Sequence, residues 1–145
     1  MNTKVNLGGL EMATPLTTAS GTFGYGTEYL GAVDYSCLGA VTAKGVRLSP
    51  WPGNPMPRHA EVPGGLVNAI GLQGPGIDEF LGHYIPLYRE KCGTLPMIVN
   101  IWGGSIEEYA QVAQRLEDYA TQPSNSLPLA IECNVSCPNV KAGGH

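Results

Sequence analysis

The residues best suited to chemistry lie near the C-terminal end of the sequence. A thiol, Cys137, sits in a predicted loop a few residues beyond a predicted strand, between the amides of Asn134 and Asn139. A thiolate can act as a nucleophile or as a general base. The alternative is an inert buried thiol, which is the usual state of a free cysteine. The residues alone make Cys137 a candidate catalytic group without naming a reaction.

Other polar residues stand where apolar segments end. Lys44 ends the segment 38–44, whereas Asn100 and Asn134 close two later segments. A buried lysine needs an anionic partner, unless its amine reaches the surface. The two asparagines could bind a heterocycle through their amides, or they could only cap turns. Glycines within 19–24 would let the backbone approach a flat ligand.

The predicted elements explain how these residues could meet. Strands are predicted at 15–20, 38–44, 96–101 and 127–134, after a small hairpin over 5–13. Helices between the strands predict a parallel sheet with crossover connections. A doubly wound sheet and a (β/α)₈ barrel both fit this order, and four strands would be half of the barrel. In both folds, ligands bind at the carboxyl ends of the strands.

The helices and the long loop have more detailed predictions. Helices are expected around 27–32, over 77–88 and after Ser105. Proline lacks the backbone N–H of a helix interior, so Pro86 is expected to split the second helix. Ser105 and Glu108 form a capping-box pattern for the third. The expected apolar face of that helix consists of Ile106, Tyr109, Ala113, Leu116 and Ala120. The glycine- and proline-rich segment 45–65 is expected to be a functional loop.

Composition limits the possible classes of protein. A hydrophobic fraction of 43% and a net charge of −4 exclude a disordered chain. Only 8 Lys and Arg residues occur, without a run, which argues against a nucleic-acid partner. No apolar stretch has the length of a membrane span or a signal peptide, so a cytoplasmic location is expected. The 4 cysteines are expected to be free thiols, and no metal site is predicted.

Five segments, taken in order, resemble the class 1 dihydroorotate dehydrogenases. They are residues 19–24, 42–44, 53–58, 68–72 and 134–144, so the resemblance covers essentially the whole chain. It implies that residues 1–145 form the N-terminal half of an FMN-binding (β/α)₈ TIM barrel, an α/β fold preceded here by the small β-hairpin. The C-terminal half of the same barrel would then be needed to complete the site.

The resemblance also implies an activity. Members of the family oxidise (S)-dihydroorotate to orotate in pyrimidine biosynthesis, and Cys137 would be the base that removes the C5 proton while hydride passes from C6 to FMN. Residues 71–73 and 139–144 look most like the NAD-linked subclass, 1B. There, a homodimer of catalytic subunits associates with an electron-transfer subunit that carries FAD and a [2Fe-2S] cluster, giving a heterotetramer. The fumarate-using subclass, 1A, is the nearer alternative.

Binding residues follow from the same resemblance. The residues expected to bind the substrate are Lys44, Asn68, Ala69, Ile70, Gly71, Leu72, Asn134 and Asn139. Those expected to contact FMN are Ala19, Ser20, Gly21, Lys44, Asn100 and Asn134. Ser136 adjoins the base and is expected to bind or orient it.

Two other functions stay open. An isolated half-barrel would leave sheet edges exposed, so the chain could be a non-catalytic piece that folds by pairing with another chain. It could also be a related flavin enzyme, of the dihydropyrimidine dehydrogenase type, that acts on another dihydropyrimidine.

Overall fold

A three-stranded parallel sheet forms the centre of the protein in the computed structural model, which describes residues 3–125 and 127–136. The sheet contains β3 (Val41–Val46), β6 (Met97–Ile101) and β7 (Leu129–Cys133), in the order β3-β6-β7. These strands confirm three of the four that the sequence predicts. The fourth, at 15–20, makes only one parallel bridge, between Thr17 and Ala40.

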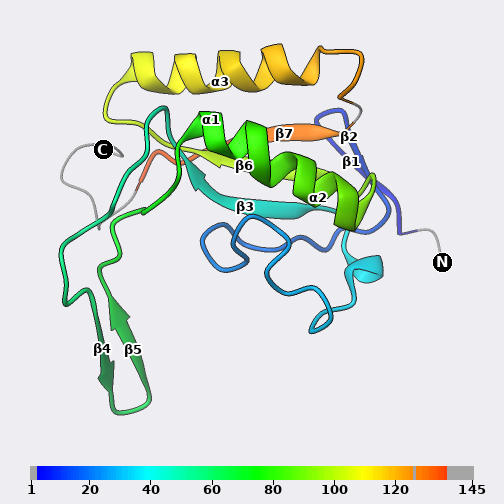
Figure 1. Cartoon of the computed structure of the whole chain (residues 1–145). Helices are drawn as coiled ribbons and strands as arrows, with labels where there is room; N and C mark the ends of the chain where they lie inside the picture. Colours follow the sequence, from blue (N-terminus) through cyan, green and yellow to red (C-terminus); the bar gives the residue numbers. More distant parts are fainter. Residues whose placement is uncertain (1–2, 126, 137–145) are drawn as a thin grey trace.

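The helices lie over one face of the sheet (Figure 1), and side chains of the sheet and helices form the main core between them. Alternate strand residues, among them Val41, Val99 and Ile101, pack against the helices. The largest fully buried side chains of this layer are Tyr88, Phe80, Ile77, Ile85 and Met97. The outer strand β7 is less covered, because Ile131 is 43% exposed. The sheet is therefore buried at β3 and β6 and open at its β7 edge.

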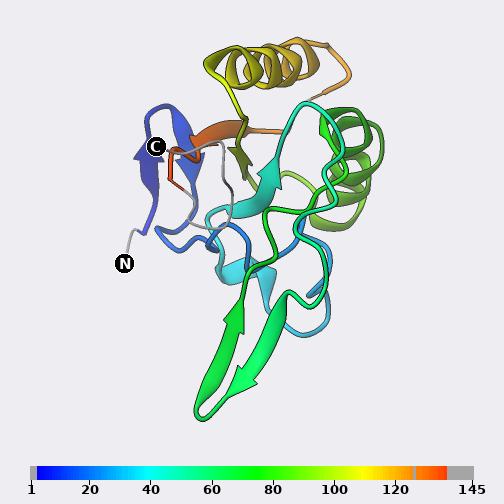
Figure 2. The same cartoon turned by 90° about the vertical axis from the view of Figure 1, so that its left-hand side faces the viewer.

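The predicted N-terminal hairpin is present and covers the opposite face of the sheet (Figure 2). It pairs β1 (Val5–Leu7) with β2 (Leu10–Met12), and its two turn glycines have positive φ angles. Leu10 and Met12 pack on Ala40 and Ile98, which point away from the helices. The hairpin thus closes this face near the amino ends of the strands.

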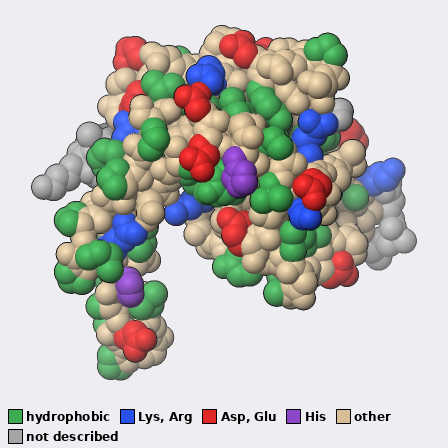
Figure 3. All heavy atoms as spheres, viewed as in Figure 1, with side chains coloured by type: hydrophobic (Ala, Val, Ile, Leu, Met, Phe, Trp, Pro, Cys, Tyr) green, Lys and Arg blue, Asp and Glu red, His purple; other side chains and the backbone are tan. Residues whose placement is uncertain are grey.

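A second hairpin corrects the prediction of a plain loop over 45–65. It pairs β4 (His59–Val62) with β5 (Gly65–Asn68) and projects from the body of the protein (Figures 1 and 3). All eight strand residues are exposed, including Leu66 at 58% and Val67 at 60%. With neither face buried, the sequence lacks the alternation by which a half-buried strand is recognised.

The helix predicted at 77–88 is continuous, and Pro86 does not split it. The path runs through α1 (Ile77–Glu79), a π-helical turn η2 (Phe80–Tyr84) and α2 (Ile85–Cys92). The Ile85 N–H donates to the carbonyl of Phe80, five residues back. This wider turn lets the helix continue past Pro86, which lies in the first turn of α2, where no N–H is needed.

The third predicted helix, α3 (Ile106–Ala120), begins as expected, and its predicted apolar face is right for Tyr109, Ala113 and Leu116, which pack on the core, but wrong for Ile106 and Ala120. The Ser105 hydroxyl accepts from the Glu108 N–H at 3.3 Å, whereas the Glu108 carboxylate accepts from the Gly104 N–H rather than from Ser105. Val112 and Leu116 are buried, but Ile106 is 84% exposed and Ala120 is also exposed. Ile106 is the first helical residue and lies beyond the packed part of the sheet.

No helix forms at 27–32, so that prediction is wrong. Gly26 and Gly31 adopt positive φ angles of 98° and 86°, and the Glu28 carboxylate accepts from the backbone N–H groups of Tyr25 and Thr27. The segment therefore forms turns, followed by the short 3₁₀ helix η1 (Tyr35–Cys37). Cys37, Cys92 and Cys133 are free thiols, and no helix among the described residues is long and apolar enough to cross a membrane.

Candidate active site

The polar residues predicted at strand ends lie along one edge of the sheet. Lys44 belongs to β3, Asn100 to β6, and Asn134 follows β7 directly. The Asn134 N–H donates to the Ile101 carbonyl at 2.9 Å, so the chain leaves β7 alongside β6. Because the three strands are parallel, their carboxyl ends meet here. This edge is the place where both candidate α/β folds bind ligands.

A β-bulge turns Lys44 at the end of β3. Regular pairing with β6 ends at Ala43 and Val99 and resumes at Val46 and Ile101. Lys44 and Gly45 therefore stand against the single residue between those partners, Asn100. An extra residue of this kind bends the strand and re-aims its side chains.

Gly45 has a steric role in the bulge. A Cβ atom there would lie 3.0 Å from both Asn100 Oδ1 and Trp102 Cδ1. A larger residue would push these side chains away, so glycine allows both to lie close over the strand. Asn100 is only 3% exposed, and its amide N–H donates to Glu132 Oε1 at 2.5 Å. That bond leaves the carbonyl Oδ1 of Asn100 facing Gly45.

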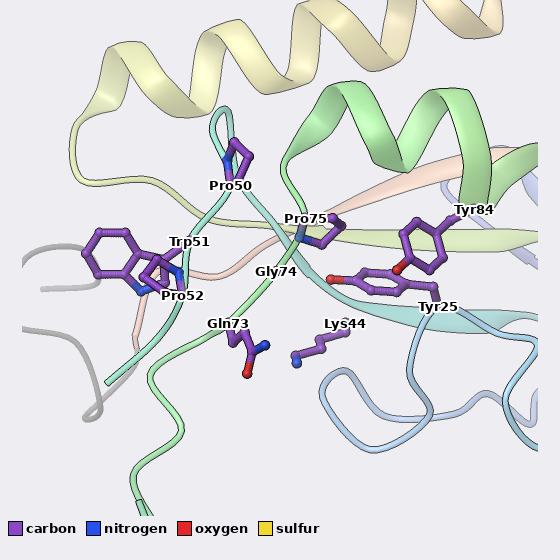
Figure 4. A pocket seen from close by; sticks show the side chains of 9 residues that line it. All are labelled: Tyr25, Lys44, Pro50, Trp51, Pro52, Gln73, Gly74, Pro75 and Tyr84. Carbon is purple, nitrogen blue, oxygen red and sulfur yellow. The ribbon is translucent and has the colours of Figure 1, made fainter. Parts of the chain in front are cut away.

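Lys44 lies on the wall of a pocket of about 460 Å³ (Figure 4). The pocket is lined by Tyr25, Lys44, Pro50, Trp51, Pro52, Gln73, Gly74, Pro75 and Tyr84. Its wall is mainly aromatic and proline side chains, and the Lys44 amine and the Gln73 side chain point toward each other across it. A flat ligand with an anionic group suits such a lining.

Lys44 gives the pocket its positive charge, and Arg58 lies close to Lys44 without lining the pocket. Burial lowers the pKa of the Lys44 amine below its ordinary value, the positive charge of Arg58 lowers it further, and Glu28 opposes both. Arg58 donates to the side-chain oxygen Oε1 of Gln73 and to the backbone carbonyl of Pro52, the latter at 2.9 Å. Within the described chain, neither Lys44 nor Arg58 forms a salt bridge with a carboxylate. The pocket therefore offers unneutralised positive charge to an anion.

Tyr25 and Tyr84 were not predicted as site residues. Their ring centroids lie 4.4 Å apart, and Tyr84 comes from the π-helical turn η2. Burial, more than the nearby Tyr84, Glu28 and Glu79, raises the pKa of the Tyr25 phenol, which therefore stays neutral. Pro86 is the sequence signal that could have indicated the altered turn, since π-turns are frequent at functional sites.

The turn at 19–24 adjoins Lys44, as its predicted role in cofactor binding requires. The Thr18 hydroxyl accepts from the Thr42 N–H at 2.9 Å, and the Lys44 N–H donates to the Gly24 carbonyl at 2.7 Å. Ala19, Ser20 and Gly21 thus follow directly after a contact with β3. Gly21 has a φ angle of 77°, which a larger residue would rarely adopt.

None of the residues predicted to bind the substrate in the segment 68–72 lines this pocket, although Gln73, the next residue, does. Asn68 ends β5 and lines a separate pocket of about 220 Å³ on the hairpin, together with Ala69. The carbonyl groups of Ala69, Ile70 and Gly71 accept from Asn54 and Trp51 and so tie the segment to the loop before it. Leu72 has a φ angle of 57°, the one positive value of a non-glycine residue among those described. Such strain is typical of functional sites.

The loop after β7 is described as far as Ser136. Tyr109 donates its hydroxyl to the Asn134 carbonyl, and Asn134 Oδ1 accepts from the Ser136 N–H at 3.3 Å. These bonds hold the start of the loop against α3. Cys137 and Asn139 lie outside the described residues, so their roles stay predictions.

Comparison with known proteins decides the family. The sequence model of one family, described as Dihydroorotate dehydrogenase, matches residues 2–145. The chain belongs to the dihydroorotate dehydrogenase family. This agrees with the resemblance of the five segments and with the pocket beside Lys44.

Individual relatives point to the same family. The chain is 49% identical over 144 residues to "Dihydroorotate dehydrogenase B (NAD(+)), catalytic subunit" of Alkaliphilus metalliredigens, covering 99% of this chain and 45% of that protein. It is 48% identical over 144 residues to the protein of that name in Desulforamulus reducens, with the same coverages. The chain thus spans less than half the length of these relatives.

A solved structure supports the fold. The crystal structure of DHODH from Eimeria tenella in complex with ferulenol superposes with a TM-score of 0.70 at 20% sequence identity, covering 97% of this chain and 38% of that one. The arrangement of parallel strands and helices is therefore that of part of a dihydroorotate dehydrogenase fold.

Proposed function

We propose that the chain carries part of the active site of a flavin-dependent dihydroorotate dehydrogenase of the NAD-linked subclass, which oxidises (S)-dihydroorotate to orotate. The observation that carries the proposal is the half-buried, unneutralised Lys44 on the pocket wall at the carboxyl edge of the sheet. It stands in a chain 49% identical to a protein named as a catalytic subunit of that enzyme.

Lys44 would bind the carboxylate of the substrate. Its burial makes an anionic partner more favourable than water alone would be, because a half-buried charge is poorly solvated. Arg58 adds positive charge from the other side of Gln73. An acidic dihydropyrimidine is therefore preferred over an uncharged one such as dihydrouracil.

The residues at the strand ends fit a flavin. Gly45 lets the Asn100 and Trp102 side chains lie close over β3, and the Trp102 indole N–H is buried without a hydrogen-bond partner among the described residues. Ala19, Ser20, Gly21, Lys44, Asn100 and Asn134 would hold FMN here. When bound, FMN supplies the acceptor for the hydride. The protein's part is to hold the substrate flat against it and to take up a proton.

Cys137 would take up that proton from C5 of dihydroorotate. The Tyr109 hydroxyl and the Ser136 N–H both donate to Asn134, three residues before Cys137, and so hold the described start of this loop. The substrate site would be completed by Asn68, Asn139 and the backbone of 69–72. This requires that the β4–β5 hairpin and the pocket beside Lys44 approach each other around the ligand.

Partners are expected on two sides. The open β7 edge, with Ile131 at 43% exposure, favours pairing with the C-terminal half of the same barrel. The names of the relatives, "catalytic subunit", favour a separate electron-transfer subunit, which would carry FAD and a [2Fe-2S] cluster and pass electrons to NAD⁺ in a cytoplasmic heterotetramer. The open edge of β7 also favours the second candidate function, a non-catalytic half-barrel that needs a complementary chain.

The purified protein's visible spectrum and its substrate preference test the proposal. A flavin absorption band that bleaches with dihydroorotate, and not with dihydrouracil, is expected. The absence of a flavin band would favour the non-catalytic half. Bleaching by dihydrouracil alone would assign the chain to the enzymes of other dihydropyrimidines.

A further inference from the structure

Trp102 is the residue at the site for which no role has been assigned. It follows β6 directly and continues its pairing, because its N–H donates to the Val46 carbonyl at 3.0 Å. The side chain is only 3% exposed. Its indole N–H is buried and has no hydrogen-bond partner in the part of the chain that the structure describes. A buried donor of this kind is costly unless something accepts from it.

The Trp102 ring is held firmly in place. The Arg47 guanidinium lies 4.8 Å from its centroid and 4.9 Å from that of Trp51, and the two rings meet edge to face at 6.0 Å. Arg47 is itself fixed by Glu108, at 2.5 Å. These contacts fix the plane of the Trp102 indole ring and, with it, the direction of its N–H.

The two tryptophans differ in one informative way. The Trp51 indole N–H donates to the Gly71 carbonyl at 2.9 Å, so its hydrogen-bonding capacity is used within the chain. Trp102 has the same type of group in the same cluster and leaves it unused. The contrast provides a control within one molecule.

An acceptor borders the same position as the unused donor. Trp102 Nε1 and Asn100 Oδ1 lie 3.5 Å and 3.0 Å from the position that a Cβ of Gly45 would take. The Asn100 N–H group is already bonded to Glu132, so the oxygen faces this side. A donor and an acceptor that border one position suit a ring that carries both C=O and N–H groups.

We propose that Trp102 is a ligand-binding residue whose indole N–H donates to a carbonyl oxygen or an unprotonated ring nitrogen of a flat heterocycle at the carboxyl edge of the sheet. Asn100 Oδ1 accepts from a ring N–H of the same molecule. The inference rests on the proposed function, which offers two heterocycles of this chemistry, the flavin ring and the pyrimidine substrate.

Nitrogen-15 NMR of the indole groups tests the assignment directly. The sequence has only 2 tryptophans, so two indole N–H signals are expected, and Trp102→Phe identifies one of them by its disappearance. FMN is added first and orotate second. The Trp102 signal should move downfield and exchange its proton more slowly with one of these additions. The Trp51 ring lines the pocket, so its signal is also expected to shift, but its N–H already donates to Gly71 and its exchange rate should change little. The addition that moves the Trp102 signal identifies the heterocycle.

The substitution provides a second readout. Trp102→Phe keeps a ring for Arg47 to contact but removes the N–H, so the dissociation constant of the heterocycle identified by NMR should rise about tenfold, which corresponds to about 1.4 kcal/mol. An unmoved Trp102 signal in protein that visibly binds both FMN and orotate would overturn the assignment. Failure of the unaltered protein to bind FMN at all would overturn the proposed function, and this inference with it.

Discussion

Replacing Glu108 with glutamine tests how the loop that carries Trp51 is held beside the pocket. The Glu108 carboxylate joins two elements, because it accepts from Arg47 at 2.5 Å and from the Gly104 N–H at 2.5 Å. Glutamine keeps an acceptor for Gly104 but leaves Arg47 without a counterion between two indole rings. The side chains of Arg47 and Glu108 are only 16% and 22% exposed, so water would replace the lost charge poorly.

The burial of this ion pair allows the loss in the free energy of unfolding to be estimated. Hydrogen bonds to charged groups contribute about 1.5–3 kcal/mol, and part of this is kept by the remaining neutral acceptor. We therefore expect Glu108→Gln to lower the free energy of unfolding by about 2 kcal/mol. For a chain of this size the midpoint of thermal unfolding should fall by about 8 °C. Circular dichroism of both proteins at neutral pH measures the difference.

The pH dependence sharpens the test. Burial raises the pKa of the Glu108 carboxyl, but the bonds from Gly104 and Arg47 outweigh it and hold the pKa below its ordinary value of 4.5. A depressed pKa stabilises the fold above the unfolded-state value and stops doing so as pH falls through the folded-state value. The two proteins should thus differ at pH 7 and converge in acid. Glu117→Gln, an exposed change on the same helix, is the control. The reasoning is refuted if Glu108→Gln costs no more than that control.

Three further predictions concern the pocket, the base and the core. Lys44→Met should weaken orotate binding about 10- to 100-fold, because a charge-assisted bond is lost. Calorimetry that finds less than a threefold change would contradict the role of Lys44. The turnover number should rise with pH around the ordinary thiol pKa of about 8.5, because the Cys137 thiolate forms there. Substrate affinity should fall at higher pH, because burial lowers the pKa of Lys44 and its amine loses its charge at a lower pH than an exposed lysine does. A turnover number that does not change with pH would count against a thiol base. Val112→Ala should lower the free energy of unfolding, measured in urea, by about 2–3 kcal/mol, and Ile106→Ala by less than about 0.5 kcal/mol. The reason is that the Val112 side chain is fully buried and Ile106 is 84% exposed. Equal losses would mean that Ile106 packs on the core, as the sequence predicts.

The sheet was predictable because burial leaves a clear pattern. Strands β3 and β6 are covered on both faces and appear as short apolar runs, which is how a buried parallel strand is recognised. The hairpin β4–β5 buries neither face, so its residues carry no such pattern. At 27–32, the backbone angles of two glycines and the bonds of Glu28 outweigh helix propensity. Local sequence patterns therefore predicted the elements that the core determines, and failed for the exposed ones.

The site was predictable only in part for a related reason. Residues at strand ends, such as Lys44 and Asn100, follow from the positions of the strands. Gln73 and Trp102 reach the site through the paths of loops and through the bulge at Lys44 and Gly45, which depend on pairing between distant segments. A glycine directly after a lysine that ends a strand was the one signal of that bulge in the sequence.

Reduction of the bound flavin by dihydroorotate tests the central claim most directly. Under anaerobic conditions, dihydroorotate is mixed with the flavin-loaded protein, with its Cys137→Ala variant and with a Cys133→Ala control, and flavin absorption is followed in time. Cys133 is exposed in β7 and is given no part in the chemistry. We predict rapid bleaching in the unaltered protein and the control, and loss of rapid bleaching in Cys137→Ala with flavin still bound. Equally rapid bleaching in all three would contradict the account.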